Sequence, residues 1–161
     1  MIKNIKDEWE TPKELFDKLD FLYKFTADAC ATSKNKKCKT FFRDALKCDW
    51  YKTLKDKNNV GAVFMNPPYS NPKPFLAKAW HESKNLVVVC LVPNNILTCK
   101  YMDIFDTLGG KGNFRDFSES LKIRFLPRRT RFYHPSKNIS SPPGGCMVLI
   151  MDRRKEQNEI N

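Results

Sequence analysis

Residues 60–65 form an apolar run that stops at two consecutive prolines. The run Val60-Gly-Ala-Val-Phe-Met65 is apolar at positions that face both sides of a strand, which is typical of a central parallel strand covered by helices on both faces. Pro67 and Pro68 prevent the strand from continuing and remove two backbone donors. The sequence therefore predicts a buried strand from Gly61 to Met65 that ends at outward-facing carbonyl acceptors.

The rest of the chain alternates between strand and helix patterns. A capping box, Thr11-Pro12-Lys13-Glu14, predicts a helix over about 12–22. Further helices are expected from Asn71 and over about 100–108, a loop over 109–113, and strands over 25–28, 39–42, 86–92, 121–126, 130–133 and 146–151. This order predicts an α/β fold: a Rossmann-like, doubly wound, mostly parallel sheet with an antiparallel C-terminal hairpin at its edge. We expect one domain over residues 1–152 and a charged tail over 153–161.

Two polar residues close predicted strands. Asp28 ends the first strand and Asn66 ends the strand before the prolines. Because ligands of doubly wound sheets bind outside the carboxyl ends of the strands, both residues should face one crevice. The chain contains no Gly-x-Gly-x-x-Gly and no Walker loop, which argues against a standard dinucleotide or nucleoside-triphosphate site.

Composition favours a polyanionic partner. Lys and Arg total 29 against 18 Asp and Glu, a formal charge of +11 in 161 residues, which attracts nucleic acid and makes binding sensitive to salt. A charge of this sign also attracts membrane surfaces, but no stretch is long and apolar enough to span one. The six cysteines form no Cys-x-x-Cys pair, so we predict no metal site, and reduced thiols fit a cytoplasmic protein.

The tetrapeptide Asn66-Pro67-Pro68-Tyr69 suits the methylation of an amino group. The nitrogen of an exocyclic amine on a base is a poor nucleophile until acceptors hold its two hydrogens. The Asn66 side-chain oxygen and the Pro67 carbonyl are suitable acceptors, and Tyr69 is suited to stack on the base. A simple turn is the alternative interpretation, but the position after a buried strand and before an aromatic residue favours the site.

Several short sequence motifs, taken together, resemble those of one family. These are Trp9-Glu-Thr-Pro12, Asp28-Ala-Cys-Ala31, Asp44-Ala-Leu46, Phe64-Met-Asn-Pro-Pro-Tyr-Ser70 and Arg129-Thr-Arg-Phe132. Across roughly residues 9–151 the chain resembles the small phage-type DNA N6-adenine methyltransferases of the Dam group. The resemblance implies the S-adenosylmethionine methyltransferase fold, S-adenosylmethionine as cofactor and adenine in double-stranded DNA as substrate. It also implies a phage or restriction-modification setting in the cytoplasm of a bacterial or phage-infected cell.

The same resemblance implies roles for individual residues. Trp9, Thr11 and Pro12 match an N-terminal cofactor motif in which the threonine hydroxyl binds the methionine carboxylate. Asp28 would oppose the methionine ammonium group. Ala29 and Cys30 stand where other methyltransferases carry glycines. Asp44 or Asp49 would accept from the ribose hydroxyls or the adenine amine of the cofactor, and the sequence leaves open which does so. The alternative for Asp44 is a turn cap, and the alternative for Asp49 is an ion pair with a surface lysine.

A basic segment near the C-terminus is the candidate DNA contact. Arg128, Arg129 and Arg131 stand among aromatic residues, and Lys137 lies in a polar loop beyond them. This pattern suits phosphate contacts with base stacking, although such runs also occur on solvated strand faces. Two other functional classes stay open: an RNA or protein-glutamine methyltransferase that uses the same tetrapeptide, and a non-catalytic basic DNA-binding module.

Overall fold

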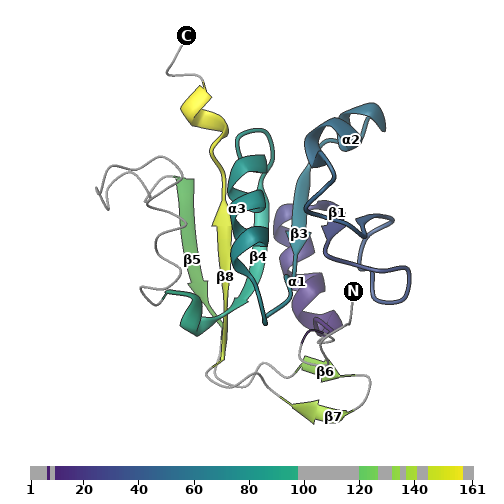
Figure 1. The fold of residues 1–161 in the computed structure, drawn as a ribbon, viewed down its shortest axis with the longest axis vertical. Helices are drawn as coiled ribbons and strands as arrows, with labels where there is room; N and C mark the ends of the chain where they lie inside the picture. Colours follow the sequence, from purple (N-terminus) through teal and green to yellow (C-terminus); the bar gives the residue numbers. More distant parts are fainter. Residues whose placement is uncertain are drawn as a thin grey trace.

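The computed structural model describes residues 7, 10–97, 120–126, 132–134, 137–140 and 145–157. Figure 1 shows a central sheet with helices packed against it. The helices are α1 (Lys13–Tyr23), α2 (Trp50–Asp56) and α3 (Lys73–Glu82), with short 3₁₀ turns η2 (Asn94–Leu97) and η3 (Arg154–Gln157). The strands are β1 (Phe25–Ala29), β2 (Thr40–Phe42), β3 (Ala62–Met65), β4 (Val88–Pro93), β5 (Leu121–Phe125), β6 (Phe132–His134), β7 (Lys137–Ser140) and β8 (Cys146–Met151).

Six strands form one sheet in the order β2-β1-β3-β4-β8-β5. The first four are parallel, and β8 runs antiparallel to both β4 and β5. The prediction of an α/β, mostly parallel sheet is therefore confirmed. The chain moves from β1 to β2 on one side and then to β3 on the other, so the strand order reverses beside β1, where such sheets bind ligands.

The antiparallel part of the sheet differs in detail from the expected edge hairpin. The last strand, β8, is inserted between β4 and β5 instead of lying at the edge. A hairpin does form from β6 and β7, but it makes a separate two-stranded sheet. The difference arises because β8 is apolar throughout and fully buried, whereas β5 is mostly exposed and suits an edge.

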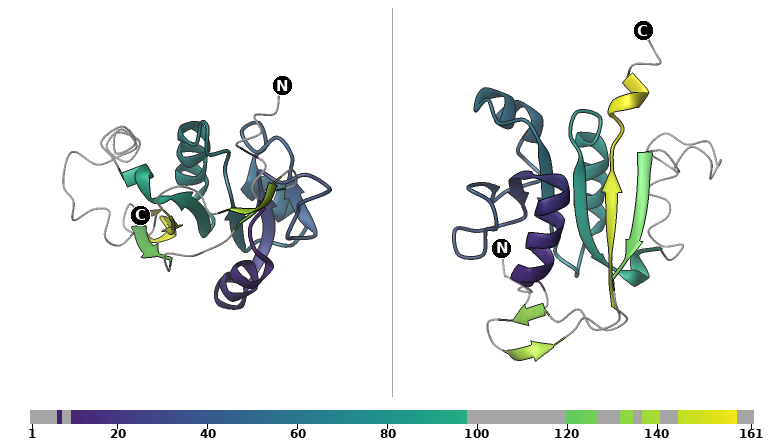
Figure 2. Two further views of the ribbon diagram at one scale, coloured as in Figure 1. Left: turned by 90° about the horizontal axis from the view of Figure 1, so that it is seen from below. Right: turned by 180° about the vertical axis from the view of Figure 1, so that it is seen from behind.

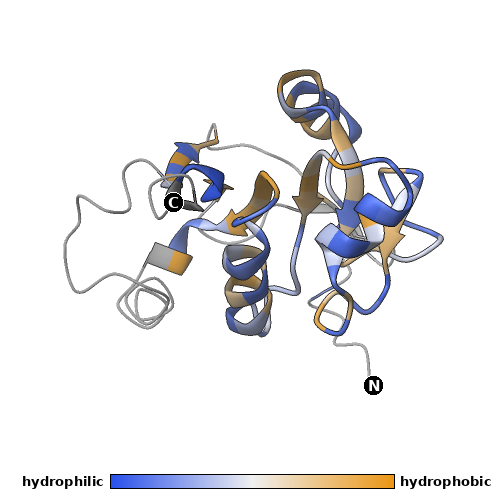
Figure 3. Cartoon of the chain, turned by 90° about the horizontal axis from the view of Figure 1, so that it is seen from above, coloured by the Kyte–Doolittle hydropathy of each residue, from blue (hydrophilic) through white to orange (hydrophobic). Residues whose placement is uncertain are grey.

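Helices cover both faces of the sheet, as the doubly wound pattern requires. Phe16 and Leu19 of α1 pack on Phe64 and Val89 of the strands, with Phe16 and Phe64 edge to face at 5.2 Å between ring centroids. The opposite face carries α2 and α3, whose buried residues are Trp50, Leu54, Leu76, Ala79 and Trp80. Figure 2 shows α1 on the side of the sheet away from α3. Figure 3 shows that the central strands are mainly hydrophobic, whereas the helices carry both hydrophobic and hydrophilic residues.

The start of α1 differs from the predicted capping box. Pro12 is the N-cap residue, and no side chain makes a capping hydrogen bond there. The helix itself lies within one residue of the expected bounds. Thr11 is only 3% exposed, because it turns away from the helix end and lines a cleft described below.

The helix α2 was missed because it is short and depends on a distant carboxylate. The Asp49 side chain accepts from the backbone N–H of Lys52 at 2.8 Å. The buried carboxylate of Glu82 accepts from the backbone N–H groups of Trp50 and Tyr51, each at 3.2 Å. Two acids thus satisfy the first N–H groups of this helix, which otherwise have no partner within it.

The β6–β7 hairpin lies beyond the carboxyl ends of the parallel strands (Figure 1). Phe132 of β6 is fully buried in the same hydrophobic cluster as Phe16 of α1 and Cys146 of β8. The expected helix over 100–108 and loop over 109–113 lie outside the described residues. No helix within the described part of the chain is long and apolar enough to cross a membrane.

Candidate active site

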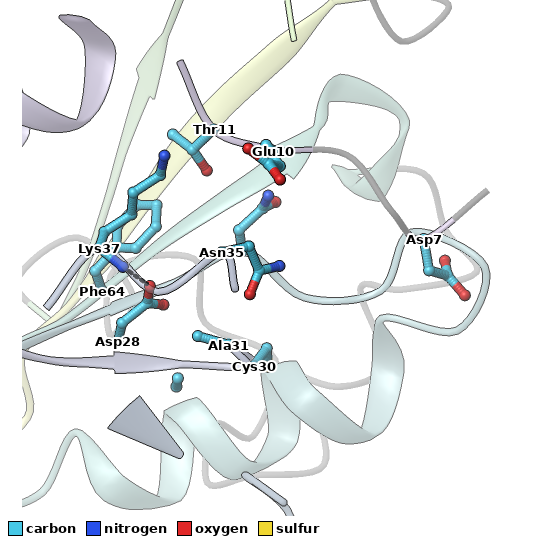
Figure 4. A pocket seen from close by; sticks show the side chains of 11 residues that line it. Asp7, Glu10, Thr11, Asp28, Cys30, Ala31, Asn35, Lys37 and Phe64 are labelled. Carbon is cyan, nitrogen blue, oxygen red and sulfur yellow. Dashed lines mark hydrogen bonds between the residues drawn. The ribbon is translucent and has the colours of Figure 1, made fainter. Parts of the chain in front are cut away.

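A cleft lies at the carboxyl ends of β1 and β3 (Figure 4). The space that its walls surround is about 350 Å³, a figure that includes volume open to solvent. The walls come from the N-terminal segment, the end of β1 with the loop after it, and the end of β3. The lining residues are Asp7, Glu10, Thr11, Asp28, Ala29, Cys30, Ala31, Asn35, Lys37, Phe64 and Asn66.

Asp28 is a buried acid in this cleft, 4% exposed. Its register partner on β3 is Phe64, so the two side chains lie on the same face of the sheet. The carboxylate accepts a hydrogen bond of 2.7 Å from the backbone N–H of Lys37. Burial raises the pKa of Asp28 to about 7, although this hydrogen bond and the Lys37 charge oppose the rise. The carboxyl group is thus poised to ionise when a cationic group binds beside it.

The loop between β1 and β2 holds polar groups over Asp28. The Asn35 side-chain oxygen accepts from the Thr32 backbone N–H at 2.7 Å and from the Thr32 hydroxyl at 2.9 Å. The Lys36 backbone N–H bonds to the Thr32 carbonyl at 3.0 Å. These bonds close a compact turn, which fixes Asn35 and Lys37 against the cleft.

Cys30 has the backbone conformation of a glycine. Its φ is 68°, in the left-handed region that side chains with a Cβ adopt at a cost. The turn after β1 therefore keeps a glycine-type path although Ala29 and Ala31 flank it. Both alanines are buried, at 1% and 4% exposure, so small side chains still let the backbone approach the cleft.

The N-terminal segment is tied to the end of the proline motif. The Asp7 carboxylate accepts from the Ser70 backbone N–H at 2.9 Å and from the Ser70 hydroxyl at 2.6 Å. Ser70 directly follows Tyr69, so this pair brings Glu10 and Thr11 to the same end of the sheet as Asn66.

The Asn66 to Tyr69 motif follows β3 as predicted. Asn66 lines the cleft, and its side-chain oxygen is buried. Pro67 is buried, whereas Pro68 and Tyr69 are half-buried. The Tyr69 hydroxyl lies 3.7 Å from the Cys146 sulfur of β8. Burial raises the pKa of the Tyr69 phenol well above its usual value, so this side chain is a neutral aromatic group.

Comparison with known proteins identifies the family of this site. The model of the family described as "DNA N-6-adenine-methyltransferase (Dam)" matches residues 1–160. The chain belongs to this family.

Individual relatives agree with that membership. The chain is 37% identical over 168 residues to the DNA N-6-adenine-methyltransferase of Escherichia phage T1, covering 94% of this chain and 65% of that protein. It is 37% identical over 97 residues to the enzyme of the same description from Haemophilus phage HP1, covering 56% of this chain and 51% of that protein. A putative methyltransferase of Escherichia coli, YfdM, is 33% identical over 72 residues, or 42% of this chain and 77% of that protein. The chain thus spans less than two thirds of the length of the two phage proteins.

Five residues expected from the Dam resemblance meet in the cleft. They are Thr11, Asp28, Ala29, Cys30 and Asn66. Pro12 is the adjoining N-cap of α1, and Trp9 lies outside the described residues. The N-terminal motif, the end of β1 and the proline motif therefore converge, although they are far apart in the sequence.

The two ribose candidates lie elsewhere. Asp44 forms an exposed ion pair with Lys47 at 3.1 Å, and its carbonyl accepts the Lys47 and Cys48 backbone N–H groups. Asp49 caps α2. Neither residue lines the cleft. Their local contacts are the reverse of the expected alternatives, because Asp44 makes the surface ion pair and Asp49 makes the cap.

The candidate DNA contacts are only partly described. Arg128, Arg129 and Arg131 lie outside the described residues. The expected loop at Lys137 is wrong, because Lys137 begins the strand β7, which pairs with β6; only the backbone is described there. On β5, Lys122 and Arg124 are exposed, and Phe125 is 68% exposed. The basic and aromatic pattern of this segment is therefore accessible at least over β5.

Several cleft residues escaped the sequence analysis. Asn35 and Lys37 lie in a polar loop to which the sequence assigned no role, and Glu10 lies within the N-terminal motif but was not assigned a role of its own. One signal was present: the loop over 32–37 follows directly on a strand that carries the candidate acid. A loop in that position passes over the carboxyl end of its own strand.

Proposed function

We propose that the chain transfers a methyl group from S-adenosylmethionine to the N6 amino group of adenine in DNA. The observation that carries this proposal is the convergence of Asp28 and Asn66 in one cleft at the point where the strand order reverses. Membership of the Dam family and the names of the phage relatives support the choice of DNA adenine as the acceptor.

The donor set of the cleft fits an amino-acid-bearing cofactor. A buried carboxyl group at Asp28 suits an ammonium group, and the Thr11 hydroxyl suits a carboxylate. When bound, S-adenosylmethionine supplies a methyl group on a positively charged sulfur, which leaves with the electrons of the broken carbon–sulfur bond. The small residues Ala29 and Ala31 allow the backbone to approach such a ligand closely.

The proline motif would hold the acceptor. The Asn66 side-chain oxygen and the Pro67 carbonyl accept the two N6 hydrogens, which directs the nitrogen lone pair toward the methyl group. One N6 proton is lost to solvent after the transfer, so no strong base is needed. The target base has to leave the DNA stack to reach this site, and Tyr69 stacks on it there.

The charge of the chain supports a DNA substrate. The formal charge of +11 and the exposed Lys122 and Arg124 of β5 favour contact with phosphates. We assign Arg128, Arg129, Arg131 and Lys137 to the same interface. A DNA substrate of this kind would place the activity in the cytoplasm of a bacterial or phage-infected cell.

The test is transfer of labelled methyl to unmethylated DNA, with the product nucleosides identified by mass spectrometry. We expect N6-methyladenine. The variant Asn66→Ala should lower turnover by roughly 10²- to 10³-fold, since it removes one preorganised acceptor, while cofactor affinity changes little.

Parallel assays on RNA and on protein cover the two other methyltransferase substrates. Label only in RNA or in glutamine side chains would refute the DNA assignment. Binding of DNA without binding of S-adenosylmethionine would identify a non-catalytic module instead.

A further inference from the structure

Lys37 is fixed beside Asp28 through its backbone. Its N–H donates to the Asp28 carboxylate at 2.7 Å, and the turn closed by Thr32 and Asn35 holds the loop in place. A substitution at Lys37 that keeps the backbone N–H therefore leaves the Asp28 hydrogen bond intact. The side chain and the backbone of this residue can be tested separately.

The Lys37 side chain extends along the cleft away from this hydrogen bond. In Figure 4 its amine points toward Thr11, while the Asp28 carboxylate lies at the other end of the same wall. None of the ion pairs formed between described residues involves Lys37. The neighbouring Lys36 differs, because its amine lies over the Phe41 ring, 4.9 Å from the centroid.

The wall thus presents an ionisable carboxyl group at one end and an amine with a hydroxyl at the other. An α-amino acid carries the complementary pair, an ammonium and a carboxylate on one carbon. A cation facing a carboxylate forms a charge-assisted hydrogen bond that is stronger than one between neutral groups. The hydroxyl of Thr11, which is 3% exposed, adds a donor that is already withdrawn from water.

We propose that the Lys37 ammonium, with the Thr11 hydroxyl, binds the carboxylate of the cofactor's methionine while Asp28 opposes its ammonium group. This inference rests on the proposed function and assigns to the cleft a cation that the sequence motifs do not contain. It makes the loop after β1 a specificity element for the amino-acid tail of the ligand.

Two ligands distinguish the binding of the amino-acid tail from the binding of the nucleoside. S-adenosylhomocysteine carries the amino-acid tail, and 5′-methylthioadenosine lacks it. Isothermal titration of both ligands against the unaltered chain, Lys37→Ala and the matched control Lys36→Ala needs no catalysis. We expect Lys37→Ala to weaken S-adenosylhomocysteine binding roughly 10- to 100-fold, the factor for one hydrogen bond between charged groups.

Binding of 5′-methylthioadenosine should stay within about twofold for both variants, because each side chain is remote from the nucleoside in this proposal. Lys37→Arg should recover part of the loss, since it keeps the charge. Thermal melting of each variant checks that the fold is intact.

The outcomes are distinct. If the unaltered chain binds S-adenosylhomocysteine and Lys37→Ala binds it equally well, the inference is overturned and the proposed function stands. Equal weakening of both ligands would make Lys37 a structural residue, which also overturns the inference. If the unaltered chain binds neither ligand, the proposed function itself fails.

Discussion

The Tyr69 hydroxyl lies 3.7 Å from the Cys146 sulfur, so the last residue of the proline motif touches the first residue of β8. Burial raises the pKa of both groups, so both are neutral and either one can donate. The contact holds the far edge of the tyrosine ring against the antiparallel part of the sheet. The contact thereby limits the orientations that the ring can adopt.

This contact separates two roles of Tyr69. Tyr69→Phe loses only the hydroxyl contact, and we expect kcat/KM for DNA to fall no more than a few-fold. Tyr69→Ala loses the stacking surface, which is worth about 1–3 kcal/mol per base, so kcat/KM should fall by roughly one to two orders of magnitude. Steady-state kinetics of both variants on an oligonucleotide substrate measures the two values of kcat/KM. An equal loss in both variants would assign the function to the hydroxyl instead of the ring.

The raised pKa of Asp28 predicts that cofactor affinity depends on pH. Below about pH 7 the carboxyl group is protonated in the free cleft and opposes an ammonium group poorly, so affinity should rise with pH up to about 7 and then level off. Among the neighbours that titrate, the Cys30 and Cys38 thiols stay neutral because burial raises their pKa. Lys37 supplies the positive charge, and Glu10 also faces the cleft.

Titration of S-adenosylhomocysteine between about pH 5 and pH 8 measures this effect. Asp28→Asn should abolish the rise and bind weakly throughout. Lys37→Ala removes a charge that lowers the Asp28 pKa, so the rise should shift to higher pH. A profile unchanged by Asp28→Asn would show that another group titrates.

The Glu82 carboxylate should be a major determinant of stability. It is 4% exposed, lies 2.6 Å from the Lys78 amine and accepts from two backbone N–H groups of α2. Glu82→Ala leaves these donors buried without a partner, and we expect a loss of about 3 kcal/mol in the free energy of unfolding. Urea denaturation measures it. The control is Asp17→Ala, which breaks the exposed Lys13–Asp17 pair. This variant should lose less than about 0.5 kcal/mol in the free energy of unfolding. Equal losses in the two variants would refute the role of Glu82.

The positive φ of Cys30 predicts an unusual order of stability. At ordinary positions alanine is more stable than glycine, but a Cβ is strained at a φ of 68°. Cys30→Gly should therefore be more stable than Cys30→Ala by about 0.5–1 kcal/mol. Ala31→Gly, at a buried position without a positive φ, should be destabilising and serves as the control. If Cys30→Ala proved the more stable of the two variants at position 30, the turn would not need the left-handed conformation.

The elements that the sequence predicts well are those with a local signal. Strand β3 follows from its continuous apolar run, and α1 follows from Leu15, Leu19 and Leu22 at helical spacing. The convergence of Asp28 and Asn66 follows from a general rule about parallel sheets. These inferences need no knowledge of distant contacts.

The features that were missed or misplaced depend on partners far along the chain. Helix α2 is completed by Glu82, whose bond to Trp50 joins residues 32 positions apart. Thr11 stands at the first position of a capping-box motif, but its side chain lines the cleft and does not cap the helix. Lys37 becomes a cleft residue only because its loop returns to Asp28. Such roles are decided by tertiary packing, which a local pattern does not encode.

The place of β8 in the sheet has a consequence for synthesis. Until residues 146–151 leave the ribosome, β4 has no partner on one side, although all six of its residues are buried in the finished sheet. An apolar strand with an open edge is a template for pairing with other chains. Fragments that stop before Cys146 should therefore aggregate, and rapid completion or chaperone binding should govern the yield of the folded chain.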